Sequence, residues 1–187
     1  VPATGGNFSA RTASGYVVTA SGFDKGQLGT HAFIEFDHEG NRTKGSGNPS
    51  AETELHLNMY KLIPSAKFVL HTHSVAATVL SRVIKGHAIN LHGYEMQKSL
   101  SGVKSHLDTL SIPIFDNDQD IDRLTLLVSD HHLHTPIEHA VLIRGHGLYV
   151  VGRDIKEVLR HLEGLEFLFS CELERLKLEG IQAGVQP

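Results

Sequence analysis

Short apolar stretches bounded by glycines and polar turns alternate along the chain with longer amphipathic stretches, which predicts a mixed α/β fold. Residues 16–20 and 31–37 are rich in β-branched and aromatic side chains, and the glycines around them favour two neighbouring antiparallel strands. Further strands are predicted at residues 69–73, 88–91, 110–115, 140–143 and 148–151.

Three helices are predicted where apolar positions recur every three or four residues, at 51–63, at 75–84 and from Asp154 to about residue 178. Ser50, Ser74 and Asp154 stand where an N-cap side chain accepts a hydrogen bond from the first turn. At 1.5 Å per residue the last helix would span roughly 40 Å, so part of it is expected to face another subunit.

Length, composition and charge narrow the class of protein. The chain has 187 residues, 40% of them apolar, and no Pro- or Ser-rich linker, so residues 1–187 are predicted to form one domain. A net charge of -4 without a basic cluster argues against a nucleic-acid partner. No apolar stretch approaches the roughly 20 residues of a membrane span, no secretory signal is present and Cys171 is alone, so a cytoplasmic protein is expected. Val1 stands where Met would, which is consistent with a missing N-terminal segment.

Three histidines stand in positions suited to binding one metal ion. His71 and His73 end an apolar run, and in an extended segment residues i and i+2 point to the same side. His146 lies between two glycines in a distant turn that the fold can bring to the same point. Three protein ligands around a tetrahedral ion such as zinc leave a fourth position open, as a Lewis-acid catalyst requires. The spacing therefore indicates a metal-dependent enzyme.

A His-x-His pair also arises by chance in a chain with 14 histidines, many of which are expected on the surface or hydrogen-bonded in the core. A second segment offers an alternative metal site, although its crowding near a helix end and a turn favours a solvated stretch: His131, His132, His134 and His139. A cupin site and the His-x-His-x-Asp-His pattern of metallo-hydrolases do not fit, because Val75, Ala76 and Ala77 stand where further ligands would be.

Two carboxylates lie near the segments that carry these histidines. Glu52 is in the first turn of a predicted helix, and Glu95 precedes a helical stretch at residues 96–100. Each would ordinarily be a surface glutamate that favours the positive end of a helix. A metal enzyme also needs a proton-transfer group that is not itself a ligand, so both remain candidates.

Small and hydroxyl-bearing residues near strand ends and a helix start can bind an anion through backbone N–H groups: residues 5–9, Ser21, Gly22 and Ser50. Taken singly, these segments are ordinary turns. The chain has no Gly-x-x-x-x-Gly-Lys phosphate loop, and residues 45–50 lack the third glycine of a dinucleotide loop. A small phosphorylated metabolite is therefore favoured over a nucleotide.

Five short motifs follow one another along the chain: Gly6-Asn7-Phe8-Ser9, Thr19-Ala20-Ser21-Gly22, Ser50-Ala51-Glu52-Thr53, His71-Thr72-His73-Ser74 and Gly145-His146-Gly147. In this order and spacing they resemble the class II aldolase/adducin family over nearly the whole chain. The resemblance implies a single α/β domain with a central, mostly antiparallel sheet flanked by helices. Within the family, residues 93–98, 113–120 and 161–166 are similar to a branch of dehydratases.

The resemblance to that branch implies an activity and a cofactor. The expected reaction removes water from 5-methylthioribulose 1-phosphate, a ketose phosphate of methionine salvage, and gives 2,3-diketo-5-methylthiopentyl 1-phosphate. Zinc is expected on His71, His73 and His146. Glu95 is favoured as the acid/base, with Glu52 as a substrate contact or second proton carrier, because eukaryotic members of the branch have a cysteine at the position of Glu52.

The resemblance also implies how the phosphate is held and how the subunits assemble. Asn7, Ser21, Gly22 and Ser50 match phosphate contacts of the aldolases, although Ala51 replaces a second serine, and Lys98 is expected to add charge. Relatives of this kind form homotetramers with sites between subunits. Two alternatives stay open: a class II sugar-phosphate aldolase, and a non-enzymatic adducin-like scaffold, which would be expected to lack the histidines.

Overall fold

The computed structural model describes residues 5–184, with side chains described through residue 180, so the start of the chain at Val1 lies outside the described residues. The strands are β1 (Asn7–Thr12), β2 (Gly15–Thr19), β3 (Phe33–Phe36), β4 (Arg42–Lys44), β5 (Phe68–Thr72), β6 (Ala88–Leu91), β7 (Leu110–Phe115), β8 (Ala140–Ile143) and β9 (Gly147–Gly152). The helices are α1 (Thr53–Leu62), α2 (Val75–Val83), α3 (Ile121–His134) and α4 (Ile155–Gly184), with short 3₁₀ helices η1 (Thr30–Ala32) and η2 (Glu95–Ser99).

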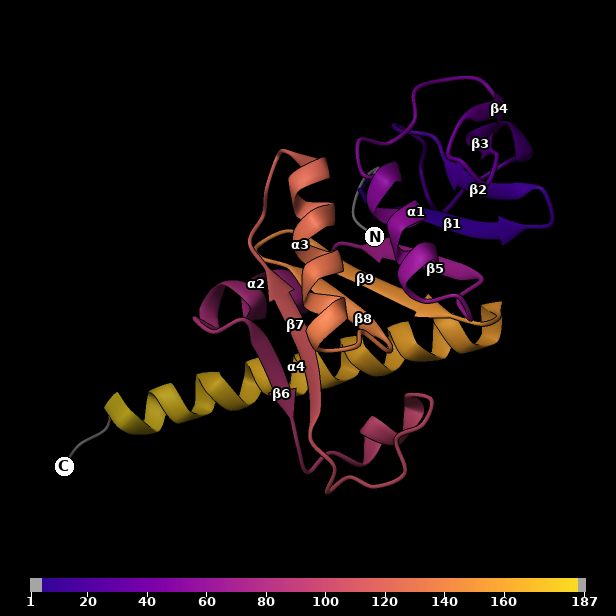
Figure 1. Ribbon diagram of the computed structural model, residues 1–187. Helices are drawn as coiled ribbons and strands as arrows, with labels where there is room; N and C mark the ends of the chain where they lie inside the picture. Colours follow the sequence, from indigo (N-terminus) through magenta and orange to yellow (C-terminus); the bar gives the residue numbers. More distant parts are fainter. Residues whose placement is uncertain (1–4, 185–187) are drawn as a thin grey trace.

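The strands form one sheet in the order β4-β3-β2-β1-β5-β9-β8-β7-β6, and every neighbouring pair is antiparallel except β7 and β8. Helices α1 and α3 lie on one face of the sheet, and α2 and α4 cover the other (Figure 1). Each face buries its own apolar cluster, which is how a sheet with two apolar faces is stabilised. The expected α/β fold, with a mostly antiparallel sheet flanked by helices, is confirmed.

The predicted strands at 88–91, 110–115 and 140–143 match β6, β7 and β8 residue for residue, whereas β1 is not predicted. Strand β1 buries two polar side chains, Asn7 and Ser9, which are 3% and 4% exposed. Ser9 Oγ lies 2.7 Å from His56 Nδ1 and 2.8 Å from Tyr60 Oη. Hydrogen bonds therefore satisfy these buried polar groups. The strand was missed because buried strand positions are recognised in a sequence by their apolar side chains. Strand β4 and helix α3 were also not predicted; β4 is exposed throughout.

Helix α1 begins at Thr53, so the predicted N-cap role of Ser50 is wrong. Glu52 holds the N-cap position and makes no side-chain cap hydrogen bond. Ser50 Oγ instead accepts hydrogen bonds from Asn7 Nδ2 at 3.0 Å and from Glu52 N at 3.3 Å. A serine side chain that forms another local hydrogen bond is not available to cap a helix. Here the hydrogen bond from Asn7 connects the start of α1 to β1.

The other two predicted caps are present. Ser74 Oγ accepts from Ala77 N at 3.0 Å, and Asp154 Oδ1 accepts from Glu157 N at 2.8 Å. Helix α4 has 30 residues and spans about 45 Å, which is longer than predicted, and its C-terminal part extends past the sheet (Figure 1). Among the described residues, no helix combines the length and apolar character needed to cross a bilayer.

Candidate active site

The end of β5 and the turn between β8 and β9 bring three histidines together. His71 is buried in β5, His73 follows the last residue of that strand, and His146 lies in the turn. Strands β5 and β9 pair with Thr72 opposite Leu148, so the turn before β9 reaches the end of β5. The centroids of the three imidazole rings lie 4.7 to 5.0 Å apart.

The orientation of the rings fits a metal ion. His71 Nδ1 lies 3.1 Å from Leu148 O, so Nδ1 donates there and leaves the lone pair of Nε2 for a metal. His71 Nε2 and His73 Nε2 are 2.9 Å apart, and one ligand nitrogen from each of the three residues falls within 4.8 Å of the others. Nitrogen ligands about 2.0–2.1 Å from a tetrahedral zinc lie about 3.4 Å from one another, so the set could hold such an ion.

Burial keeps two of these imidazoles neutral. It lowers the pKa of His71 to about 3, although the charge of Glu52 opposes the change. Burial, followed by the charge of His146, also lowers the pKa of His73. Metals bind the neutral imidazole, so neither residue has to lose a proton at neutral pH before it can act as a ligand.

Gly147 allows the two strands to approach beside the histidines. A Cβ at this position would overlap the Thr72 carbonyl oxygen and would lie 2.8 Å from His73 Cδ2 and 2.9 Å from His71 Cε1. Gly145, on the other side of His146, has φ of +67°, in the left-handed region that favours glycine. The two glycines of the sequence motif therefore shape the turn that presents His146.

Glu52 is the carboxylate that this chain places at the cluster. Its Oε1 lies 3.1 Å from His146 Nε2 and 3.6 Å from His71 Nε2, and Asn7 Nδ2 donates to Oε2 at 2.5 Å. Burial would raise the pKa of Glu52, but the hydrogen bond with His146, the electrostatic interaction with His71 at the low pH where both groups titrate, and the hydrogen bond from Asn7 together lower it to about 2. Glu52 is therefore ionised at neutral pH and can accept a hydrogen bond from a substrate hydroxyl.

A polar cavity of about 190 Å³ opens beside the histidines. The predicted phosphate contacts Asn7, Ser21, Gly22 and Ser50 all line it. Its other lining residues are Gly6, Ala20, Lys25, Glu52, His73 and His146. The structure thus brings the candidate phosphate contacts, one carboxylate and two of the histidines to one place.

Lys25 is a residue of this cavity that the sequence did not reveal. Its side chain is buried, with 9% of the residue exposed, and Nζ donates to Phe23 O at 2.9 Å. Burial lowers the pKa of Lys25, while the negative charges of Asp24 and Glu52 act in the opposite direction. A lysine beside serine and glycine N–H groups can make charge-assisted hydrogen bonds to a phosphate. No motif marks this lysine, so only the folded loop identifies it.

Glu95 and Lys98 lie in η2 and do not line this cavity. The Glu95 side chain is 73% exposed, forms an ion pair with Lys98 Nζ at 2.6 Å and lies 3.6 Å from His106 Nδ1. The hydrogen bond from Lys98 lowers the pKa of Glu95. Within one chain, the structure does not bring Glu95 or Lys98 to the histidines.

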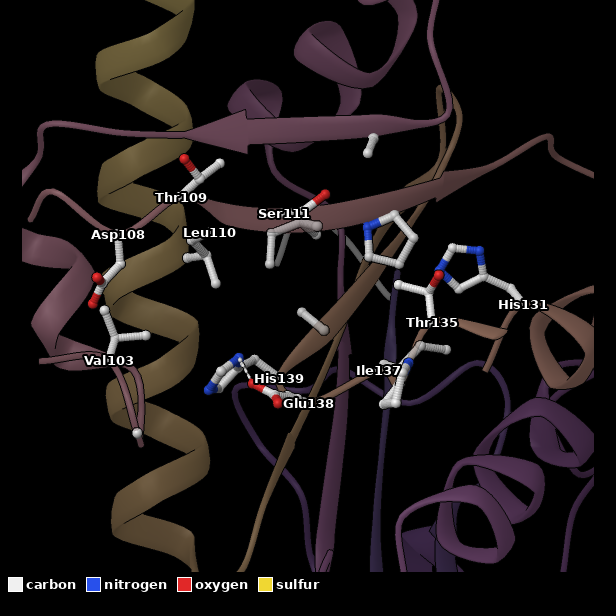
Figure 2. Close-up of a pocket in the computed structure, with 16 residues that line it drawn as sticks. Val103, Asp108, Thr109, Leu110, Ser111, His131, Thr135, Ile137, Glu138 and His139 are labelled. Atoms are coloured by element: carbon white, nitrogen blue, oxygen red, sulfur yellow. Dashed lines mark ion pairs between the residues drawn. The ribbon is translucent and has the colours of Figure 1, made fainter. Parts of the chain in front are cut away.

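A larger cavity of about 420 Å³ lies elsewhere, beside β7, the end of α3 and the segment before β8 (Figure 2). His131 and His139 line it from different sides. His132 Nδ1 accepts from Ile137 N at 3.1 Å, and His139 Nε2 lies 2.7 Å from Ser101 O. Over the part of the chain that the structure describes, His71, His73 and His146 form the one group of ligand atoms close enough for a metal, so the alternative histidine site is not supported.

Comparisons with known proteins agree with this picture. Residues 1–173 match the sequence model described as Class II Aldolase and Adducin N-terminal domain. The chain is 70% identical over 183 residues to methylthioribulose-1-phosphate dehydratase of Pseudoalteromonas translucida, which covers 98% of this chain and 87% of that protein. It is 55% identical over 179 residues to the protein of the same name from Pectobacterium atrosepticum, which covers 95% of this chain and 87% of that protein.

Among solved structures, the crystal structure of L-fuculose-1-phosphate aldolase from Thermus thermophilus superimposes with a TM-score of 0.75 at 25% identity. The match covers 96% of this chain and 88% of that chain. The fold, the order of the motifs and the extent of the sequence match lead to one conclusion: the chain belongs to the class II aldolase/adducin family.

Proposed function

We propose that this chain is a zinc-dependent hydro-lyase that removes water from 5-methylthioribulose 1-phosphate and forms 2,3-diketo-5-methylthiopentyl 1-phosphate in methionine salvage. The observation that carries the proposal is the convergence of three imidazoles beside an ionised carboxylate and a small polar cavity. The 70% identity with a protein named methylthioribulose-1-phosphate dehydratase supports the choice of substrate and reaction.

His71, His73 and His146 would hold the metal. When bound, a divalent ion such as zinc supplies a Lewis acid that polarises the C2 carbonyl of the ketose and makes the C3 proton easier to remove. The bond from His71 Nδ1 to Leu148 O fixes the orientation of that ring, so its Nε2 needs no rearrangement to act as a ligand.

The polar cavity would bind the phosphate. Asn7, Ser21, Gly22 and Ser50 supply amide, hydroxyl and backbone donors, and Lys25 supplies a positive charge. Because His73, His146 and Glu52 line the same cavity, a phosphate held there would direct the neighbouring sugar carbons toward the histidines. Binding at the phosphate therefore orients the carbons that react.

Proton transfer is assigned to the two carboxylates. Glu95 would take the C3 proton and return it to the C4 hydroxyl, which leaves as water, and the resulting enol tautomerises to the diketone. Glu52 would hydrogen-bond a substrate hydroxyl or act as a second proton carrier. Since Glu95 is exposed and outside the cavity of its own chain, its role requires a second copy to bring η2, with Lys98, to these histidines. We therefore propose a cytoplasmic homotetramer with sites between subunits.

The test is to mix the purified protein with 5-methylthioribulose 1-phosphate and to follow diketone formation with and without a chelator. Diketone should form, stop when the metal is removed and resume when zinc is returned. Cleavage of the carbon chain into two fragments would indicate an aldolase instead, the alternative that the position of Glu52 beside the histidines favours. Metal-loaded protein that changes neither the substrate nor related ketose phosphates would indicate a scaffold.

A further inference from the structure

Helix α2 contacts two of the three histidine-bearing segments. The helix begins directly after His73 and Ser74, and Ser74 caps its first turn. One turn further along, Thr78 Oγ1 donates to the backbone carbonyl of His146 at 3.1 Å. A single rigid element therefore connects the segment that carries His73 with the turn that carries His146.

Arg144 fastens this turn to the C-terminal end of α2. Its Nη1 donates to Ser81 O at 2.7 Å and to Ile84 O at 2.6 Å, and its Nη2 donates to Gly86 O at 2.9 Å. Gly145 N also donates to Ser81 Oγ at 3.0 Å. The last carbonyls of a helix lack intrahelical partners and form its negative end, so they bind a guanidinium through charge as well as geometry.

The remaining contact of Arg144 contributes less. Arg144 Nε donates to Asp116 Oδ1 at 2.6 Å, but the Asp116 side chain is 76% exposed, whereas the Arg144 side chain is 21% exposed. An ion pair with an exposed carboxylate restrains the arginine only weakly. The bonds to the carbonyls at and after the end of α2 are therefore the part of the contact that holds the turn.

We propose that α2 sets the separation of His73 and His146, and that Thr78 and Arg144 are positioning residues for metal binding. The inference rests on the proposed metal site. Neither residue lines the polar cavity, and both act on the backbone at or beside His146. Residues behind metal ligands fix their orientation, and their loss weakens metal affinity by about 10- to 100-fold.

The experiment measures zinc affinity by chelator competition on the purified full chain. Thr78→Val keeps the side-chain shape and removes the hydroxyl donor, and Thr78→Ser restores it. Arg144→Met keeps the aliphatic stem and removes all the guanidinium donors. Arg82→Met is its matched control, because the stem of Arg82 lies beside Gly145, yet no hydrogen bond joins Arg82 to the turn among the described residues.

Arg144→Met should weaken zinc binding by about 10- to 100-fold and Thr78→Val by a smaller factor, while Thr78→Ser and Arg82→Met stay close to the starting protein. Arg144→Lys should not restore the affinity, because one ammonium cannot replace a planar fork with several donors. If Arg144→Met fails to fold, the comparison of Thr78→Val with Thr78→Ser decides.

A lower melting temperature of the metal-free variants together with unchanged zinc affinity would overturn the proposal, since the contacts would then stabilise only the fold. A His146→Ala protein that keeps its zinc would instead remove the metal site on which the inference rests. The two failures are therefore distinguishable.

Discussion

The regions around Glu52 and Glu95 differ in how much of their surroundings one chain supplies. Glu52 lies at the start of α1 with a side chain 15% exposed, and it contacts Asn7 from β1, His71 from β5 and His146 from the β8–β9 turn. Glu95 lies in η2 with a side chain 73% exposed, where it forms an ion pair with Lys98 and lies near His106. Residues from β1, β5 and the β8–β9 turn hold the Glu52 side chain in place, whereas contacts on the protein surface restrain Glu95 only weakly. One chain therefore supplies the whole surroundings of Glu52, the first region. Glu95, in the second region, needs the surface of another subunit before it can take part in the chemistry.

Loss of a histidine is expected to have the largest effect, because it dismantles the first region. Replacing His71, His73 or His146 with Ala leaves two imidazoles and should remove most bound zinc and nearly all activity. Zinc content and turnover measured on the same sample check this expectation. The melting temperature of each metal-free variant controls for folding, and full zinc occupancy in His146→Ala would contradict the three-ligand site.

Substitution of the carboxylates tests the comparison directly. Glu95→Gln keeps the shape but cannot take a proton, so kcat should fall by roughly 10²- to 10⁴-fold. Glu52→Gln should cost less, because an amide at position 52 still hydrogen-bonds a substrate hydroxyl. Both variants must first be shown to bind normal amounts of zinc. If Glu52→Gln is inactive and Glu95→Gln keeps a nearly normal kcat, Glu52 is the main acid/base and Glu95 is not.

A mixing experiment sharpens the same prediction. If Glu95 acts at the histidines of another copy, Glu95→Gln and His146→Ala proteins are each inactive but can build intact sites when they share an oligomer. Unfolding and refolding the two together should restore part of the activity, whereas each refolded alone stays inactive. No recovery in verified mixed oligomers would place Glu95 at a site of its own chain or outside the reaction.

A smaller loss is expected from Lys25, at the phosphate side of the first region. Lys25→Met should lower kcat/KM by about 10- to 100-fold, because a charge-assisted hydrogen bond contributes about 1.5–3 kcal/mol. The dephosphorylated sugar should react far less efficiently than the substrate, and equally poorly with both proteins. Lys61→Met, at an exposed position of α1, is the control. Equal kcat/KM with and without the phosphate would rule out phosphate binding in the cavity.

The last prediction concerns how the free energy of unfolding depends on pH, and its effect at neutral pH is the smallest. Burial lowers the pKa of His56 to about 4, against about 6.5 when unfolded, so the folded chain keeps this imidazole neutral. Between pH 6.5 and 4 only the unfolded chain gains the proton, so stability falls as the pH falls. From pH 7 to pH 5 the loss for this residue should be about 2 kcal/mol.

Urea unfolding of the metal-free protein measures this slope. His71, whose pKa burial also lowers, adds to it in the same direction. His56→Gln should flatten the slope. A free energy of unfolding that does not change between pH 7 and pH 5 would show that His56 is not held neutral.

The sequence by itself determined the parts of the molecule that depend on neighbouring residues. Apolar runs such as those of β6, β7 and β8 gave the right strand boundaries, because helices cover both faces of the sheet, so most positions of these strands are apolar and polar turns mark their ends. Ser74 and Asp154 capped their helices as predicted, since an N-cap bond spans only three residues. The spacing of His71, His73 and His146 predicted three imidazoles at one point, and the structure brings them together.

Tertiary structure alone decided the features that depend on distant partners. Ser50 does not cap α1, because its hydroxyl accepts a hydrogen bond from Asn7, 43 residues away. The hydrophobic pattern does not predict β1, because its buried residues Asn7 and Ser9 are polar and hydrogen-bond to side chains of α1. Lys25 enters the cavity through a loop that carries no motif, and the position of Glu95 depends on how η2 lies on the fold. Hydrogen bonds and ion pairs between remote segments leave no periodicity in a sequence, so only the folded chain shows which polar residues meet.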